Sequence, residues 1–336
     1  MIHWITLVFL TILPNLLHAK GSKSLDVSNG KISADIGDQG IFFEDVNSEF
    51  DLEEAFSQHQ SGAFKPHPKK RNSFGFSKST WWSALPITQD SEKPVELNFI
   101  HKYANADLIE MYLVSQTGDI LFQKIGGDKL INNPEAIENR LVTLNGVLPQ
   151  GKYYLFTKIL TSGSVIFDIR VEDAKTYAIN NVWGYVLVCS LIGMISIMAI
   201  YNLCMYIQLR RTTYLLYVFF VCTQIYAPLV YTGMFKHIFS DFTFFMNDGF
   251  LHFSALASIS IYMFANRFLG IHKHRWLTYL LRFGYLHSFL LVAATMYDYN
   301  LGGKIGVLNG MLCSVISLGC GITLSLKGIV QLTFIQ

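Results

Sequence analysis

Two adjacent tryptophans and a short acidic pair are the side chains of this sequence whose chemistry best suits a binding site. Trp81 and Trp82 stand next to each other, and Asp45 follows Glu44. Neighbouring residues of a β-strand point to opposite faces, so one ring would fill a core while the other is presented outside for stacking on a sugar. The alternative is that both rings cover core and rim, and that the acidic pair is a solvated loop. Both interpretations stay open.

Residue patterns for catalysis do not stand out. There is no activated nucleophile, paired catalytic carboxylates or phosphate-binding loop, and His59, His67 and His101 lack partners at metal-ligand spacing. All five cysteines lie in the apolar back half without a CxxC pair, so we expect no metal site and no disulfide in the front half. The basic run at 69–71 is expected in a solvated loop, and no basic stripe suggests nucleic-acid binding. We therefore expect neither an enzyme nor a cofactor.

Charge divides the 336 residues into two unlike parts. Residues 20–182 hold 17 basic and 21 acidic side chains, whereas residues 183–336 hold 9 and 3. Ahead of both parts, an apolar run ends at Ala19 and is typical of a secretory signal peptide, either cleaved or kept as an anchor. We predict a signal peptide at 1–19, an exported domain at 20–180 and a membrane domain at 181–336.

The exported part has the alternating pattern of half-buried strands. We predict hairpins from 108–114 to 120–125, with Gly118 in the turn, and from 153–156 to 165–171 through a turn at Thr161–Ser164. A further strand is expected at 95–99 and a short helix at 52–58. Several short strands without a long helix favour a β-sandwich of jelly-roll type.

The back half contains long uncharged runs, each able to cross about 30 Å of hydrocarbon. We predict five spans and the beginning of a sixth at 328–336; the five lie at 183–208, 212–235, 247–267, 276–297 and 305–326. The predicted fold class is thus a β-sandwich followed by a polytopic bundle of transmembrane α-helices.

The connecting loops predict the orientation of these spans. Two loops, containing Arg210 with Arg211 and Arg267 with Lys273 and Arg275, are basic, whereas the alternate loops hold Lys236, Asp241 and Asp248, and Asp298 and Lys304. Basic loops stay inside, so the amino-terminal domain lies outside. Four polar residues within the spans would form hydrogen bonds between helices or line a polar path: Asn202, Gln224, His252 and His287. Asn247 and Asp248 are expected to cap the third span.

Several of these segments, taken in order, resemble one known receptor family. Six segments of the front half are similar in order and spacing to the extracellular domain of that family. They are 41–45, 50–54, the run from Gly75 to Trp82, the hairpin 111–119, Gly127-Asp128 and the hairpin 154–163. The most specific match is the loop from Tyr201-Asn202 through Arg210-Arg211 to Tyr214 and Tyr217. Together they resemble the bacterial seven-transmembrane receptors with diverse intracellular signalling modules (7TMR-DISM), in the class with jelly-roll extracellular domain 2.

That resemblance implies a sensor with a truncated seven-transmembrane region. The jelly-roll would detect a small-molecule or carbohydrate-like ligand through Trp81, Trp82, Asp45 and Arg140, the last being either a ligand contact or a structural ion pair. Four residues of the first loop would fix the topology and transmit the signal: Asn202, Arg210, Arg211 and Tyr214. At the position of Arg211 the family has an acidic residue, so this chain departs from the family there. Relatives carry a diguanylate cyclase or a histidine kinase as output, which this chain lacks, either as a fragment or as a natural truncation.

The expected location is the bacterial inner membrane with the sensor in the periplasm. Expected partners are the ligand and the lipid bilayer, with a homodimer left open. Two other functions compete: a polytopic transporter, and a membrane-anchored binding protein without signalling.

Overall fold

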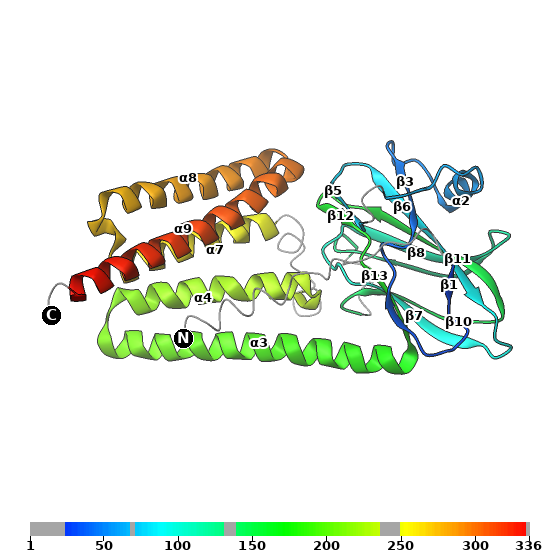
Figure 1. The fold of residues 1–336 in the computed structure, drawn as a ribbon, viewed down its shortest axis with the longest axis horizontal. Coiled ribbons are helices and arrows are strands. Elements are labelled where there is room, and N and C mark those ends of the chain that lie inside the picture. The colour runs from blue at the N-terminus through cyan, green and yellow to red at the C-terminus, as the bar shows by residue number, and fades with distance from the viewer. Residues whose placement is uncertain (1–23, 68–70, 131–138, 236–248, 334–336) are drawn as a thin grey trace.

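The computed structural model describes residues 24–67, 71–130, 139–235 and 249–333. A β-rich part, which ends at Asp173, lies at one end of an elongated bundle of helices (Figure 1). The predicted signal peptide, Lys69, Lys70, and the loop residues Lys236, Asp241, Asn247 and Asp248 lie outside the described residues.

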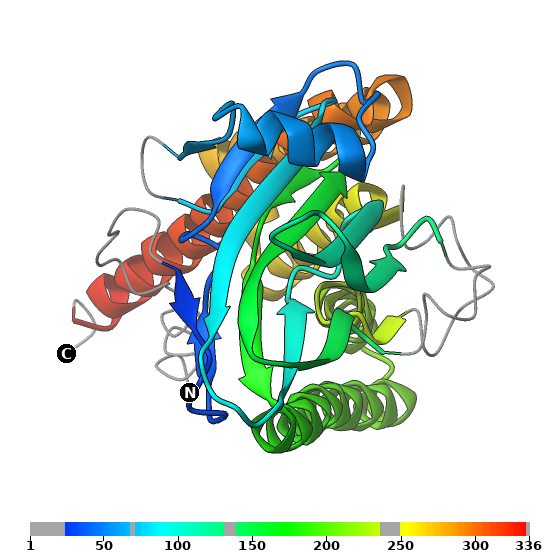
Figure 2. The ribbon, with the colours of Figure 1, turned by 90° about the vertical axis from the view of Figure 1, so that its right-hand side faces the viewer.

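Two sheets face each other in the β-rich part. The larger sheet runs in the order β4 (Lys65–Pro66), β3 (Ile41–Asp45), β6 (Thr80–Gln89), β11 (Gly151–Leu160), β8 (Leu108–Ser115), β9 (Ile120–Gly126), with β1 (Leu25–Asp26) parallel to β6. The smaller sheet is β10 (Val142–Leu148), β7 (Val95–His101), β13 (Ile169–Asp173), β2 (Ser33–Asp35). A separate pair joins β5 (Ser73–Phe76) to β12 (Ser164–Ile166). Figure 2 shows the long strands of the larger sheet crossing the end of the bundle.

The apolar core lies between these two sheets. Leu113 and Leu155 from the larger sheet meet Phe99 and Val171 from the smaller one, and none is more than 1% exposed. Burying each such side chain contributes about 1.5–3 kcal/mol. All five cysteines are free and lie in helices, so no disulfide links the strands of the sandwich.

A short helix covers the outer face of the larger sheet. Helix α2 (Leu52–Gln60) begins at a capping box in which the Asp51 carboxylate accepts from the Glu54 N–H at 2.9 Å and the Asp51 N–H donates to Glu54 at 3.0 Å. Ala55 of this helix packs with Trp82, in a cluster completed by Phe64, Phe156, Ala84 and Val114. The larger sheet is therefore buried on both faces along β6.

One predicted hairpin is confirmed and the other is wrong. β8 and β9 pair as expected, and Gly118 in their turn has φ +97°. The predicted strand at 165–171 is instead two strands in different sheets, β12 and β13. Phe167 between them is fully buried, so the alternating pattern continues through the break and hides it. β11 pairs with β6 and β8 rather than with β12.

The bundle consists of long helices that run side by side. The helices are α3 (Ala174–Leu209), α4 (Thr212–Tyr231), α7 (Gly249–Phe268), α8 (Arg275–Tyr297) and α9 (Tyr299–Thr333), with a 3₁₀ turn η2 (Ile271–Lys273) before α8. Within the described residues, four are long and apolar enough to cross a membrane: α3, α4, α8 and α9. α7 is not among them, so the span predicted at 247–267 stays a prediction. Helix α9 continues unbroken to Thr333, and the predicted start of a sixth span at Gly328 is not observed, because Lys327 alone does not end a helix.

Replacing Trp82 tests the double burial of the larger sheet. Trp82→Ala should lower the free energy of unfolding of the sandwich by about 3–5 kcal/mol, because it leaves a ring-sized cavity in a closed cluster. The measurement is hydrogen exchange at the amides of β6 and β11 in the detergent-solubilised chain. Trp81→Ala, at a partly exposed neighbour, serves as the matched control and should cost less; equal losses would contradict the assignment.

Candidate functional site at the junction of sandwich and helices

The two tryptophans lie on opposite faces of β6, as the strand pattern predicts. Trp82 is 0% exposed beneath α2. Trp81 is partly buried against the sandwich core, stacks on Phe74 with ring centroids 4.0 Å apart, and donates from Nε1 to Ser77 Oγ at 3.2 Å. Trp82 is therefore a core residue, and contact between its ring and a ligand would require α2 to move.

Asp45 holds a turn and points away from solvent. It is 3% exposed at the end of β3, and its carboxylate accepts from the Phe50 N–H at 2.9 Å, immediately before α2. This bond gives the Asp45 carboxylate a structural role in the turn that leads into α2. Asp45, Trp81 and Trp82 do not converge on one surface.

A polar group that the sequence analysis missed lies beside Trp82. Lys158 Nζ is 3.7 Å from Glu110 Oε2, 3.3 Å from the Phe50 carbonyl and 5.2 Å from the centre of the Trp82 ring. Tyr112 donates to Glu110 at 2.7 Å, and burial together with this bond raises the pKa of Tyr112. The register of β11 on β8 places Lys158 opposite Glu110, and this pairing is known only from the structure.

Arg140 belongs to the junction between the sandwich and the bundle. Its Nη1 donates to the Thr232 carbonyl at 3.2 Å, next to the end of α4, and its guanidinium lies 5.6 Å from the centre of the Tyr185 ring on α3. A cation is favoured at a helix carboxyl terminus. Gly184 leaves room for the guanidinium, where a Cβ would collide with Nη2. Burial lowers the pKa of Arg140.

A second bridge joins the sandwich to the turn between α8 and α9. Lys78, in the turn between β5 and β6, donates to Asp298 Oδ2 at 2.6 Å. Asp298 also accepts from the N–H groups of Asn300 at 2.8 Å and Leu301 at 3.2 Å, and so caps α9. These bonds, that of Lys78 foremost, lower the pKa of Asp298. Close by, Phe76 reaches Gly303, where a Cβ would collide with its ring.

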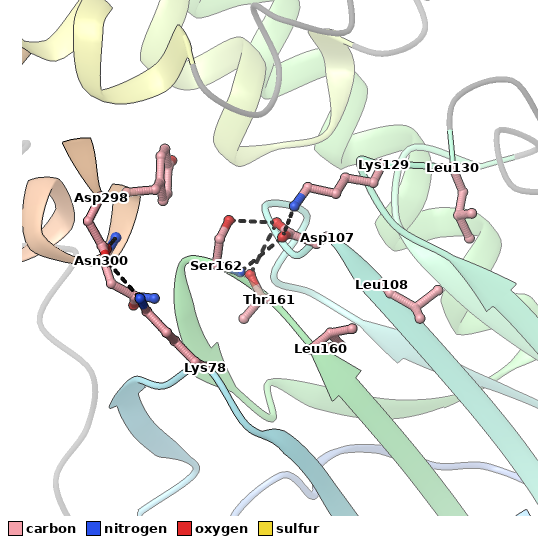
Figure 3. A pocket seen from close by; sticks show the side chains of 11 residues that line it. Lys78, Asp107, Leu108, Lys129, Leu130, Leu160, Thr161, Ser162, Asp298 and Asn300 are labelled. Carbon is pink, nitrogen blue, oxygen red and sulfur yellow. Dashed lines mark hydrogen bonds and ion pairs between the residues drawn. The ribbon is translucent and has the colours of Figure 1, made fainter. Parts of the chain in front are cut away.

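The Lys78 bridge forms one side of a cavity of about 610 Å³, here called the junction cavity (Figure 3). Its lining is Lys78, Asp107, Leu108, Lys129, Leu130, Leu160, Thr161, Ser162, Asp298, Tyr299 and Asn300. Asp107 accepts from the Ser162 N–H at 2.9 Å, from two hydroxyls and from Lys129 at 2.5 Å. The cavity thus has walls from both the sandwich and α9.

The third connection between the two parts is the chain itself. β13 ends at Asp173 and α3 begins at Ala174. Asp173 caps α3 by accepting from the Thr176 N–H at 3.0 Å. One turn further, Asn180 Nδ2 donates to Glu172 Oε1 at 2.6 Å, and that carboxylate also pairs with Arg170 at 2.9 Å. The strand and the helix are therefore fixed to each other by side chains as well as by the backbone.

The residues predicted for topology lie at the opposite end of the bundle. Arg210 and Arg211 form the connection between α3 and α4, far from the sandwich in Figure 1, and both are exposed. The Tyr214 N–H donates to the Arg211 carbonyl at 3.1 Å. Asn202 donates to the Met198 carbonyl of its own helix at 2.8 Å. This places the basic turn at the end away from the exported domain, as the loop charges predict.

A buried asparagine that the sequence analysis overlooked joins three helices. Asn309 of α9 is 0% exposed; it donates to Ser258 of α7 at 2.7 Å and accepts from Ser288 of α8 at 3.1 Å. His287 Nδ1 lies 3.2 Å from the same Asn309 oxygen. The sequence signal was a lone amide within an apolar run.

Among the described residues, no group of three His, Cys, Asp or Glu side chains could hold a metal ion.

Comparison with known proteins places the two parts in one family. The model of 7TMR-DISM extracellular 2 matches residues 37–173, which end with β13, and the model of 7TM diverse intracellular signalling matches residues 185–335. A comparison with curated proteins found no match. Both matched models describe receptor segments, and the apolar helices fit a multi-pass membrane protein with an amino-terminal extracytoplasmic domain. The chain belongs to the 7TMR-DISM family of membrane receptors for signalling.

Proposed function

We propose that this receptor detects a small, sugar-sized soluble ligand with its sandwich and transmits the change to the helices through the junction. The observation that carries the proposal is the linker-free passage from β13 to α3, reinforced by Arg140 and Lys78. A rigid connection passes a displacement of the sandwich to the helices, whereas a flexible linker would absorb it. The ligand then needs only a different affinity for two arrangements of the junction.

The rest of the proposal follows the family and the loop charges. The sandwich has jelly-roll topology and binds a carbohydrate-like compound, α7 completes five crossings, and the protein lies in the bacterial inner membrane with the sandwich in the periplasm. The output would be a cytoplasmic module such as a cyclase or a kinase. Support comes from the basic turn at Arg210 and Arg211 and from the matched family models.

The receptor proposal can be tested by removing the sandwich. With a cytoplasmic kinase reporter fused after the helices, deleting residues 20–180 should abolish ligand-dependent output while the helices still insert. Output that still responds to ligand would disprove the sensor role of this domain. Surface labelling and membrane fractionation of the deleted chain verify that it is inserted.

Arg140 gives a test of the coupling. Arg140→Gln should raise hydrogen exchange in the ends of α3 and α4 around Gly184 and Thr232 by about tenfold or more, since a hydrogen bond to a charged group is worth about 1.5–3 kcal/mol. Lys152→Gln, at an exposed position of β11, is the matched control and should leave exchange unchanged. Unchanged exchange in Arg140→Gln would show that the contact does not hold the two parts together.

Asn309 gives a test of the rigidity of the helices. Asn309→Leu should destabilise the packing of α7, α8 and α9 by about 0.6–2 kcal/mol, because it removes the hydrogen bonds that join α9 to Ser258 of α7 and Ser288 of α8. The measurement is thermal unfolding in detergent. Asn202→Leu is the control, because within the described residues the Asn202 side chain donates only to the Met198 carbonyl of its own helix. A loss no greater than that of the control would contradict the role of Asn309.

A further inference from the structure

The junction cavity has the size and position of a ligand site. At about 610 Å³ it falls within the range of roughly 300–1,000 Å³ usual for small-molecule pockets, which often lie between domains. Its walls come from the ends of β8 and β11, from the turn before β6 and from the first residues of α9. A molecule held there would touch both the sandwich and the helices.

The walls of the cavity combine apolar surface with balanced charge. Leu108, Leu130 and Leu160 supply the apolar side, and Figure 3 shows them on the other side of Asp107 from Lys78 and Asp298. The charged lining consists of two lysines and two aspartates, so its formal charge is zero. A lining without net charge does not favour a ligand of one charge sign. A ligand that carries one positive and one negative group can pair its anion with a lysine and its cation with an aspartate.

Hydrogen-bonding capacity remains at one side of the cavity. Asn300 Oδ1 is buried and has no hydrogen-bond partner among the described residues. A buried acceptor without a donor costs about 1–3 kcal/mol, so a donor at this place is favoured. Lys78 has three N–H donors, bonds to Asp298 with one, and is 74% exposed. Asp107, in contrast, already accepts from four donors.

We propose that the junction cavity binds a zwitterion with apolar side chains, namely an apolar α-amino acid or a short apolar peptide. The ligand's carboxylate pairs with Lys78, its ammonium group donates to Asn300 Oδ1 and pairs with Asp298, and its side chains lie against the three leucines. Free amino acids and peptides share this chemistry and differ in the distance between the two charges.

Binding of this kind has a consequence for the junction. The ligand replaces the direct contact of 2.6 Å between Lys78 and Asp298 with two contacts to itself, so the sandwich and the α8–α9 turn take a different separation. Occupancy of the cavity is thereby coupled to the arrangement of the helices. The binding step depends only on the cavity, whereas its effect on output rests on the proposed receptor function.

The test measures binding of L-leucine and of the dipeptide Leu-Leu to the purified full chain in nanodiscs by isothermal titration calorimetry. At least one of the two should bind, and which one binds identifies the source. N-acetyl-Leu-Leu and the methyl ester of Leu-Leu, which lack one charge each, should bind about tenfold more weakly or not at all.

Variants connect this binding to the cavity. Lys78→Gln should weaken binding at least about tenfold, because it removes the cation that pairs with the carboxylate. Lys152→Gln, an exposed lysine outside the cavity, should not. Leu160→Trp should abolish binding by filling the space; its fold is checked by circular dichroism, and if it misfolds, Lys78→Gln and the two blocked peptides decide.

Two outcomes would overturn the inference: no binding of either probe to the wild-type chain, or binding that Lys78→Gln leaves unchanged. Because the calorimetry needs no output, these results bear on the cavity alone. The receptor function is judged separately by the deletion of residues 20–180.

Discussion

The passage from β13 to α3 within one peptide unit is the constraint on which the rest of the structure depends. Asp173 ends the strand and caps the helix, so neither element can turn without the other. Helix α3 has 36 residues, or about 54 Å at 1.5 Å per residue, against about 30 Å of hydrocarbon. The helix is therefore longer than one crossing requires, and its first turns carry the sandwich, with Glu172 and Asn180 holding the two together.

The side-chain bridges of the junction differ in strength for physical reasons. The pair of Lys78 with Asp298 is largely exposed on the lysine side, so solvent screens it and it contributes little to stability. Such a contact holds one arrangement weakly and can be exchanged for a ligand. Arg140 is more buried, lies on an aromatic ring and bonds to a carbonyl beside a helix end, so it is the more permanent contact. Deeper in the bundle, Asn309 links α7, α8 and α9, which would then move as a unit.

The sequence predicted the two-part organisation and the hairpin of β8 and β9, because apolar periodicity and a glycine turn are local properties. It also predicted a basic turn at Arg210 and Arg211 on the end away from the sandwich. The sequence did not predict the pairing of strands that lie far apart along the chain. Phe167 preserves the alternation across the break between β12 and β13, so two strands of different sheets had the pattern of one. The fifth and sixth spans were predicted as separate segments, whereas α9 runs unbroken from Tyr299 to Thr333.

The candidate site was predictable only in part. The residue types selected Trp81, Trp82 and Asp45. However, α2 covers Trp82, and the Asp45 carboxylate accepts a hydrogen bond from the Phe50 N–H. The resemblance selected Arg140 without indicating that it contacts α3 and α4. By itself, the sequence determined what each segment is, an exported β-rich domain and apolar helices, since hydropathy and charge act residue by residue. Only the tertiary structure decided which side chains meet, because Lys78 and Asp298 are 220 residues apart and come together through the docking of the sandwich on the helices.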